Sequence, residues 1–98
     1  MSLTVNRKDL IGEYIGQTEL KTLSILERCL NENKNLIIEE SYAICFDDRD
    51  LFGINCLQTI VVFLKSNNLC ITFTGDSTLV NENIHNRFPS LRVAGPDK

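Results

Sequence analysis

The sequence predicts an α/β domain whose strands run parallel. Short β-type runs alternate along the chain with longer segments of helical periodicity, as in sheets built from right-handed crossovers. Three successive aliphatic residues, Leu36–Ile38, follow the polar run 31–35 and predict a strand buried on both faces, since a half-buried strand would alternate. With 98 residues and 43% hydrophobic content, the chain makes one globular domain, residues 1–98, with a modest core.

The first half of the chain begins with a short β-type run, 3–5, which ends in the charged cluster 6–9. Gly12 and Gly16 mark a loop with unusual backbone angles. Thr18 is placed to N-cap a helix, and leucines then recur at helical spacing to the polar run 31–35. The residues that form this apolar face are Leu20, Leu23, Leu26 and Leu30.

The second half repeats the pattern. A long helix, Ile54–Leu64, is apolar most of the way round and is expected to be well buried. The strand Leu69–Thr74 follows and stops at a Gly-Asp pair. A short helix over Leu79–Asn86 and a last strand over Leu91–Val93 complete the expected order.

Composition excludes several classes of protein. The net charge of −3 and the pI near 5.0 disfavour nucleic-acid binding, which requires clustered Lys and Arg. No apolar run reaches the roughly 20 residues that span a bilayer. Charged residues from Arg7 onward interrupt any signal-peptide core, so we expect a cytoplasmic or nuclear protein.

Two metal sites, for zinc and for calcium, are suggested by residue types but are not supported by the spacing of the residues. The four cysteines, Cys29, Cys45, Cys56 and Cys70, contain no C-x-x-C pair and are expected to be free structural thiols. The acidic run 48–53 begins like an EF-hand, but its fifth ligand position is Phe52. A solvated loop is the better interpretation of that run.

Glu39 and Glu40 follow the Leu36–Ile38 strand directly. In open α/β sheets ligands gather beyond the carboxyl ends of the strands, so paired acids at such a tip suggest catalysis. In phosphate-handling ATPases one acid serves Mg²⁺ and the second orients the attacking water. The alternative from the local sequence is that both acids merely solvate the end of a strand.

Several segments together resemble the CbxX/CfqX-type AAA+ ATPases, a family that includes red-type Rubisco activases, the sporulation protein K group and type VII secretion ATPases. The run 8–22 is similar to that family's RxDLVGxYIGxTxxKT segment, and 36–44 to its LFIDEAYAL Walker B segment. Three further matches, to the DFG helix opening, the LVVIxAGY sensor strand and NPGLRSRF, fall in collinear order at 50–53, 69–75 and 81–88. The similarity covers roughly residues 4–93.

The resemblance implies site residues. Glu39 matches the Mg²⁺-associated acid and Glu40 the water-polarising glutamate. Tyr14, Ile15 and Gly16 match the pore loop that grips a substrate polypeptide, although an ordinary packed tyrosine remains the alternative. Asp76 stands at the family's sensor position, which implies that it lies beside the bound nucleotide as a cofactor-binding residue. Arg87 matches an arginine finger that reaches a neighbouring subunit, against the alternative of a surface arginine.

The departures from the family are equally informative. Glu39 replaces an Asp, Asp76 replaces a Tyr, and Asn86 replaces a Ser. The 98 residues contain no G-x-x-x-x-G-K-[ST], the loop whose backbone amides and lysine neutralise a triphosphate. ATP and Mg²⁺ are therefore implied by the family only, and we expect this chain alone to bind neither and to hydrolyse no ATP.

Fold and partners follow from the same resemblance. It implies a truncated P-loop NTPase sheet of three to four parallel strands with flanking helices, in which Leu69–Thr74 forms an open edge. An open apolar edge is sticky, so residues 91–93 pair with it, a partner covers it, or the domain is only marginally stable. The expected partners are a second copy of the chain, a full-length AAA+ subunit or a polypeptide substrate.

Three hypotheses remain open on sequence grounds. The chain is a truncated or degenerate AAA+ module, either a remnant or an excised piece of an active ATPase. Alternatively, it is a non-catalytic interaction module that docks on full-length subunits and offers Arg87 in trans. The third is an unrelated small enzyme with Glu39 and Glu40 as an acid–base pair, which is disfavoured because neighbours in a strand point to opposite faces.

Overall fold

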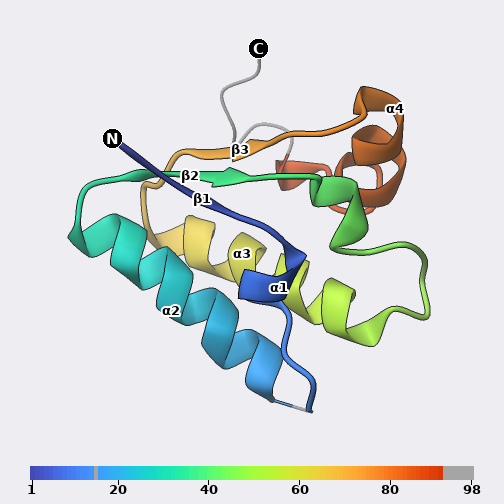
Figure 1. Cartoon of the computed structure of the whole chain (residues 1–98), viewed down its shortest axis with the longest axis horizontal. Coiled ribbons are helices and arrows are strands. Elements are labelled where there is room, and N and C mark those ends of the chain that lie inside the picture. The colour runs from blue at the N-terminus through green and yellow to red at the C-terminus, as the bar shows by residue number, and fades with distance from the viewer. Residues whose placement is uncertain (15, 92–98) are drawn as a thin grey trace.

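A three-stranded parallel sheet organises the molecule, with helices packed against one of its faces (Figure 1). The computed structural model describes residues 1–14 and 16–91. The strands are β1 (Ser2–Val5), β2 (Asn35–Ile38) and β3 (Ile71–Phe73), in the spatial order β1-β2-β3. The predicted α/β class, the parallel sheet and the place of the Leu69–Thr74 strand at an edge are confirmed within the described residues.

The register separates a helix-covered face from an open face. Leu36 pairs with Leu3 and Ile71, and this row faces the helices because Leu36 and Ile71 are fully buried. The adjacent row, Thr4, Ile37 and Thr72, lies on the open face and is exposed or half-buried. The prediction that the β2 strand is buried on both faces is therefore wrong: Ile37 has no described helix above it.

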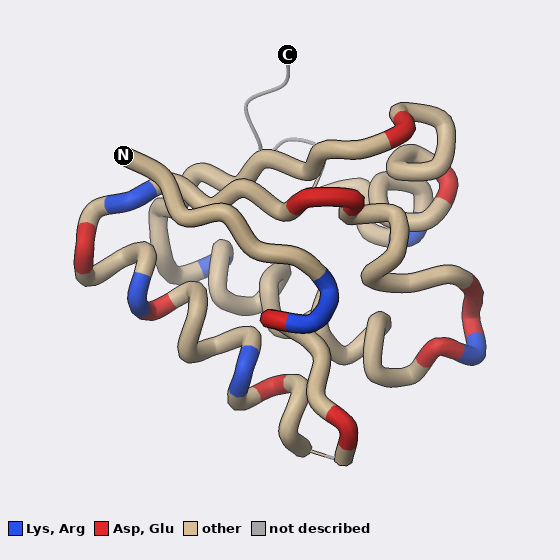
Figure 2. Tube along the Cα trace, viewed as in Figure 1, with Lys and Arg blue, Asp and Glu red and all other residues tan. Residues whose placement is uncertain are grey.

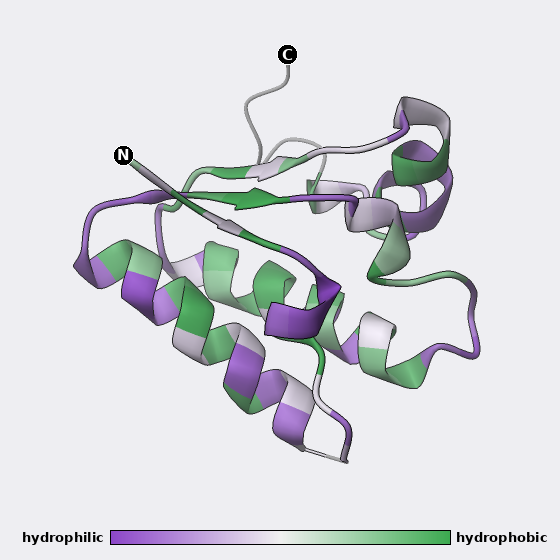
Figure 3. Ribbon diagram, in the orientation of Figure 1, coloured by the Kyte–Doolittle hydropathy of each residue, from purple (hydrophilic) through white to green (hydrophobic). Residues whose placement is uncertain are grey.

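Two long helices, α2 (Gln17–Asn31) and α3 (Leu51–Ser66), run in the same general direction and pack beneath the sheet and against each other (Figure 1). Their contact buries Leu26 of α2 and Leu57 and Ile60 of α3 completely. Burial of each such side chain stabilises the fold by roughly 1.5–3 kcal/mol. In Figure 3 the middle of β2 and much of α3 are hydrophobic, whereas α2 carries long hydrophilic stretches.

The face of α2 was predicted incorrectly. The helix buries Thr18, Thr22, Leu26 and Cys29, while Leu20 is 70% exposed. Two buried threonines shift the covered stripe away from the leucines, because they bond the loop that precedes the helix. Thr18 is not the N-cap either; Gly16 holds that position, with φ of 88°. In α3 the exposed Val62 departs from the prediction that this helix is well buried.

Short elements join these layers. They are α1 (Arg7–Leu10), the 3₁₀ turn η1 (Ser41–Ala43), α4 (Ser77–Val80) and the π-helical turn η2 (Asn81–His85). The predicted helix over 79–86 thus begins earlier and widens into a π turn. Leu91 lies in a helical turn, with its N–H bonded to the Phe88 carbonyl, and Arg92 and Val93 lie outside the described residues.

The four cysteines are free thiols, as predicted, and three of them are buried. Cys56 lies deepest; burial raises the pKa of its thiol to about 11, with the Thr22 hydroxyl oxygen 3.4 Å from its sulfur. Burial likewise raises the pKa of Cys29 and Cys45. Within residues 1–14 and 16–91, no helix combines the length and apolar content that a bilayer crossing requires.

Candidate functional site

The two adjacent carboxylates, Glu39 and Glu40, lie at the carboxyl end of β2, where Figure 2 shows an acidic stretch. Both residues are exposed, and they occupy a turn that starts after Ile38. The Glu39 N–H donates to the Val5 carbonyl at 2.8 Å, which anchors the turn to β1. Because both acids lie past the strand, the argument from strand alternation does not separate them, and that part of the prediction is corrected.

The turn is held in an unusual conformation. Glu40 has φ of 49° and ψ of 48°, in the left-handed region that residues other than glycine adopt rarely. Holding it there costs on the order of 1 kcal/mol, and such positions gather at functional sites. The Ser41 N–H and hydroxyl both donate to the Thr74 carbonyl, at 2.9 and 3.0 Å. The ends of β2 and β3 are therefore tied together beneath Glu40.

Gly75, the residue before Asp76, lies close to this turn. A Cβ at Gly75 would come within 3.0 Å of the Tyr42 ring and 3.3 Å of the Glu40 Cα. The Asp76 carboxylate N-caps α4, because its Oδ1 accepts from the N–H groups of Thr78 and Leu79 at 3.0 and 3.2 Å. A capping role accounts for the presence of Asp76, so its assignment to a cofactor rests on the resemblance alone.

Glu39, Glu40 and Asp76, which we call the acidic rim, are without a basic partner in any salt bridge between described residues. Nor do the described residues contain a group of three or more His, Cys, Asp or Glu placed to hold a metal ion by themselves. Magnesium is commonly held by one or two carboxylates together with substrate phosphates, so the rim suits a shared ion better than a protein-only site.

Arg87 follows η2, the turn that packs against η1. It forms an ion pair with Asp48 of the acidic loop, residues 47–50. The Asp48 side chain is 91% exposed, whereas the Arg87 side chain is only 21% exposed. The turn that precedes Arg87 is tied to η1, because the Asn83 side-chain amide donates to the Tyr42 carbonyl at 2.9 Å. The described contacts of Arg87 are thus with the acidic loop and not with the acidic rim.

Tyr14 is not packed: 69% of its surface is exposed. The loop that carries it is nevertheless fixed by the first turn of α2. The Gly12 N–H donates to the Thr18 hydroxyl at 2.9 Å, and the Glu13 N–H donates to the Gln17 side-chain oxygen at 2.6 Å. Gly12 has no left-handed backbone; a Cβ there would collide with the Gln17 side chain, at 2.6 Å.

The next turn of α2 secures the other end of the loop. The Lys21 ammonium donates to the carbonyls of Lys8 and Ile11 at 2.7 and 3.0 Å, and the Thr22 hydroxyl donates to that of Leu10 at 3.0 Å. These carbonyls end α1 and would otherwise be unpaired. The polar side chains of residues 17–22 therefore fix the backbone of residues 8–13, which leads to the exposed Tyr14. Ile15, the second pore-loop residue, lies outside the described residues.

Comparison with known proteins identifies the relatives of this chain. It is 32% identical over 76 residues to a protein CfxQ homolog from Guillardia theta, and 28% identical over 103 residues to stage V sporulation protein K of Bacillus subtilis. It is 31% identical over 93 residues to the ESX-3 secretion system protein EccA3 of Mycobacterium tuberculosis. The matches cover 74%, 97% and 86% of the chain.

The chain belongs to the CbxX/CfqX-type AAA+ ATPases. The resemblance inferred from its motifs is confirmed by these three relatives. The chain spans only 25%, 31% and 14% of their respective lengths, so it corresponds to a part of them. No family model matches the chain.

Arg7 is the residue of this AAA+ module that sequence reasoning missed. Its Nη1 donates to the carbonyls of Ala43 and Ile44 at 2.7 and 2.8 Å and lies 3.3 Å from the Asp50 carboxylate. It thereby connects α1, which leads to the Tyr14 loop, with η1, which directly follows Glu40. The sequence pattern places the charged run 6–9 at the end of a strand, whereas in the structure Asn6 and Asp9 form a capping box that starts α1 at Arg7.

Proposed function

We propose that this chain is a partial AAA+ module that retains the acidic half of a nucleotide-hydrolysing centre and does not hydrolyse ATP by itself. The observation that carries the proposal is the acidic rim at the carboxyl end of a parallel sheet, without a basic partner among the described residues. Acids repel a triphosphate unless lysine and backbone amides neutralise it. The motif that supplies those donors does not occur in the 98 residues.

Within a complete nucleotide site, the roles follow from residue chemistry. Glu39 would associate with Mg²⁺ directly or through water, and Glu40 would orient and polarise the attacking water. The left-handed turn at Glu40 and the bonds from Ser41 to Thr74 fix the backbone that carries Glu40 without using its carboxylate oxygens. Bound ATP and Mg²⁺ would supply the phosphoryl group and its charge neutralisation. The carboxylates fit the ion, whereas the phosphates require donors from elsewhere.

The Tyr14 loop supports a polypeptide as the substrate. An exposed aromatic ring on a loop that is bonded at both ends can press against an extended chain without losing much conformational freedom of its own. Arg87, by the same resemblance, would act on the nucleotide of a neighbouring subunit and stabilise transition-state charge. Its ion pair with the exposed Asp48 would have to be exchanged for that contact. Four free thiols suit a reducing compartment such as the cytoplasm.

A second candidate function is that of an interaction module that docks on full-length AAA+ subunits. The observation that favours it is β3, which forms an edge of the described sheet. In this alternative the chain contributes surface and Arg87, and the partner supplies the whole nucleotide site.

Transplanting the module tests the main proposal. The matched segment of stage V sporulation protein K is replaced by this chain, and ATP hydrolysis of the hybrid is measured. We expect turnover, and we expect Glu40→Gln in the hybrid to reduce kcat about 100-fold or more while ATP binding persists, because the water loses its polarising base. Glu82→Gln, in η2, is the matched control and should leave kcat unchanged. A hybrid that hydrolyses ATP equally well with Glu40→Gln would contradict the assigned role.

A further inference from the structure

The turn that carries Glu40 depends on support from its surroundings. Its backbone is left-handed, with φ of 49°, and a residue other than glycine keeps such a conformation only where the neighbouring structure enforces it. Part of that support comes from β3, because the Ser41 N–H and hydroxyl both donate to the Thr74 carbonyl. These two bonds hold the start of η1, and the residues that follow need contacts of their own.

Asn83 supplies such a contact from η2. Its side-chain amide donates to the Tyr42 carbonyl at 2.9 Å in a part-buried position, and so joins residues that are 41 positions apart. The carbonyl needs a donor from outside η1, because that turn ends at Ala43 and the last carbonyls of a helical turn have no partner within it. The bond therefore ties the two turns where they pack against each other.

Tyr42 passes this restraint on to Glu40. A Cβ at Gly75 would lie 3.0 Å from the Tyr42 ring and 3.3 Å from the Glu40 Cα, so the ring, the glycine and the turn are in close contact. With its carbonyl held by Asn83, Tyr42 cannot move away from Gly75 without breaking the hydrogen bond. The backbone at Glu40 is thus fixed from β3 and from η2 together.

We propose that Asn83 is a positioning residue for Glu40, an inference that rests on the function proposed above. It acts through the Tyr42 carbonyl, and it keeps the turn in the conformation from which the Glu40 carboxylate reaches the water. The strain of one left-handed residue and the net strength of one hydrogen bond are of similar size, so loss of the bond changes the population of the turn about fivefold. The family segment NPGLRSRF has glycine at the position of Asn83, so this contact is particular to this chain.

Steady-state kinetics of the hybrid with stage V sporulation protein K test this role. We expect Asn83→Ala to lower kcat about fivefold and to leave KM for ATP unchanged, because the water is misplaced while the nucleotide still binds. In a Glu40→Gln background the same substitution should cost nothing further, since the base that it positions is already gone. A residue with a merely structural role would lower turnover by the same factor in both backgrounds.

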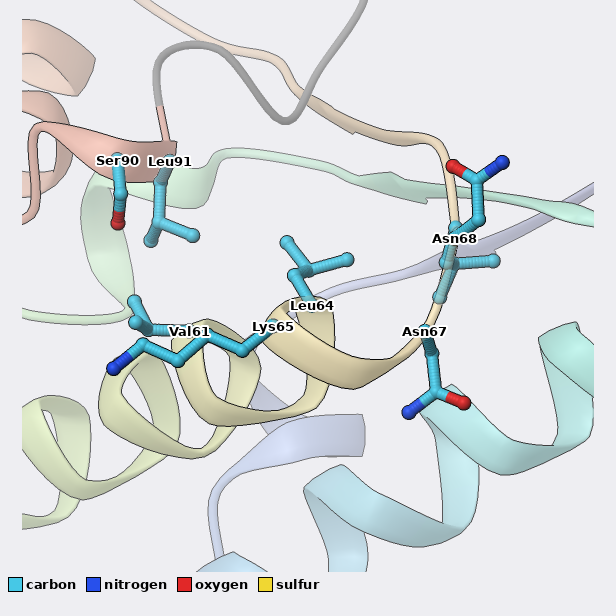
Figure 4. Close-up of a pocket in the computed structure, with 8 residues that line it drawn as sticks. Val61, Leu64, Lys65, Asn67, Asn68, Ser90 and Leu91 are labelled. Atoms are coloured by element: carbon cyan, nitrogen blue, oxygen red, sulfur yellow. The ribbon is translucent and has the colours of Figure 1, made fainter.

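Asn67→Ala is the matched control. The Asn67 side-chain amide also donates to a backbone carbonyl in a part-buried position, that of Phe63 at 3.0 Å. Figure 4 shows Asn67 after the last turn of α3, beside a groove of about 340 Å³ that it helps to line. Asn67 precedes β3 and Glu40 follows β2, so the two lie at opposite ends of the parallel sheet. Loss of the Asn67 bond should leave kcat unchanged.

Amide hydrogen exchange of the 98-residue protein tests the contact without any nucleotide. The Ser41 N–H is bonded to the Thr74 carbonyl, and the Ala43 N–H to that of Glu40, so both report on opening of the turn. Asn83→Ala should speed the exchange of these two N–H groups about fivefold. Asn67→Ala should leave both rates as they are.

Three results would overturn the proposal. One is an Asn83→Ala protein in which the Ser41 and Ala43 N–H groups exchange at their original rates. Another is an active hybrid in which Asn83→Ala leaves kcat unchanged. The third is an equal loss of turnover with and without Glu40→Gln. A hybrid without any turnover would contradict the function proposed above, and the exchange rates would still decide whether Asn83 holds the Glu40 turn.

Discussion

Replacing Gly53 by alanine is expected to lower the free energy of unfolding by about 3 kcal/mol, as overpacking against a rigid neighbour does. Inside a helix the same change ordinarily stabilises by about 1 kcal/mol. The sign reverses here because a Cβ at Gly53 would lie 2.1 Å from the Ile44 carbonyl oxygen and 2.9 Å from the Cys45 Cα. Both atoms belong to the backbone, so α3 itself must move away from the segment after η1.

Urea denaturation of the two proteins measures this effect. Gly16→Ala is the matched control: its Cβ meets no atom within 4 Å, and only its φ of 88° opposes the substitution. We expect that control to cost about 1 kcal/mol. A Gly53→Ala protein as stable as the original, or more stable, would show that α3 does not approach Ile44 as described.

Replacing Arg7 by methionine is expected to lower the free energy of unfolding by about 2 kcal/mol, the scale of hydrogen bonds to a charged group. Methionine keeps the aliphatic length but leaves the carbonyls of Ala43 and Ile44 and the Asp50 carboxylate without their shared donor. Asp50 also N-caps α3 through the Gly53 N–H at 3.1 Å, so the loss reaches that helix. Arg7→Lys should recover only part of it, because a lysine lacks the planar fork of donors.

Arg28→Met is the matched control for Arg7. Arg28 pairs with Glu32 one turn away on the surface of α2, and both side chains are about half exposed, at 52% and 45%. Exposed pairs of this kind contribute less than about 1 kcal/mol. If thermal and urea unfolding show equal losses for Arg7→Met and Arg28→Met, Arg7 is another surface arginine and does not connect α1 with η1.

The fold was largely predictable because its signals are local. The aliphatic run 36–38, the strand before Gly75 and the long apolar helix each depend on periodicity and on breakers that lie next to them. The errors arose where polar residues are buried for tertiary reasons. Thr18 and Thr22 bond the Tyr14 loop and Cys56, and they displace leucines from the covered face of α2.

The acidic rim was predictable for a different reason: two acids directly after a buried strand are visible in the sequence. The left-handed turn at Glu40 was not, since no glycine marks it. The hydrogen bonds of Arg7 were not predictable either, because their acceptors lie between 36 and 43 positions further along the chain. Contacts at that range are set by packing, and periodicity carries no information about them.

Calorimetric titration of the 98-residue protein with MgATP tests the central claim most directly. The acidic rim without phosphate donors predicts no binding heat at micromolar nucleotide, because the uncompensated carboxylates repel the triphosphate. A dissociation constant in the micromolar range, about −8 kcal/mol of binding free energy, would contradict the claim. It would mean that this chain binds phosphate through groups other than those described.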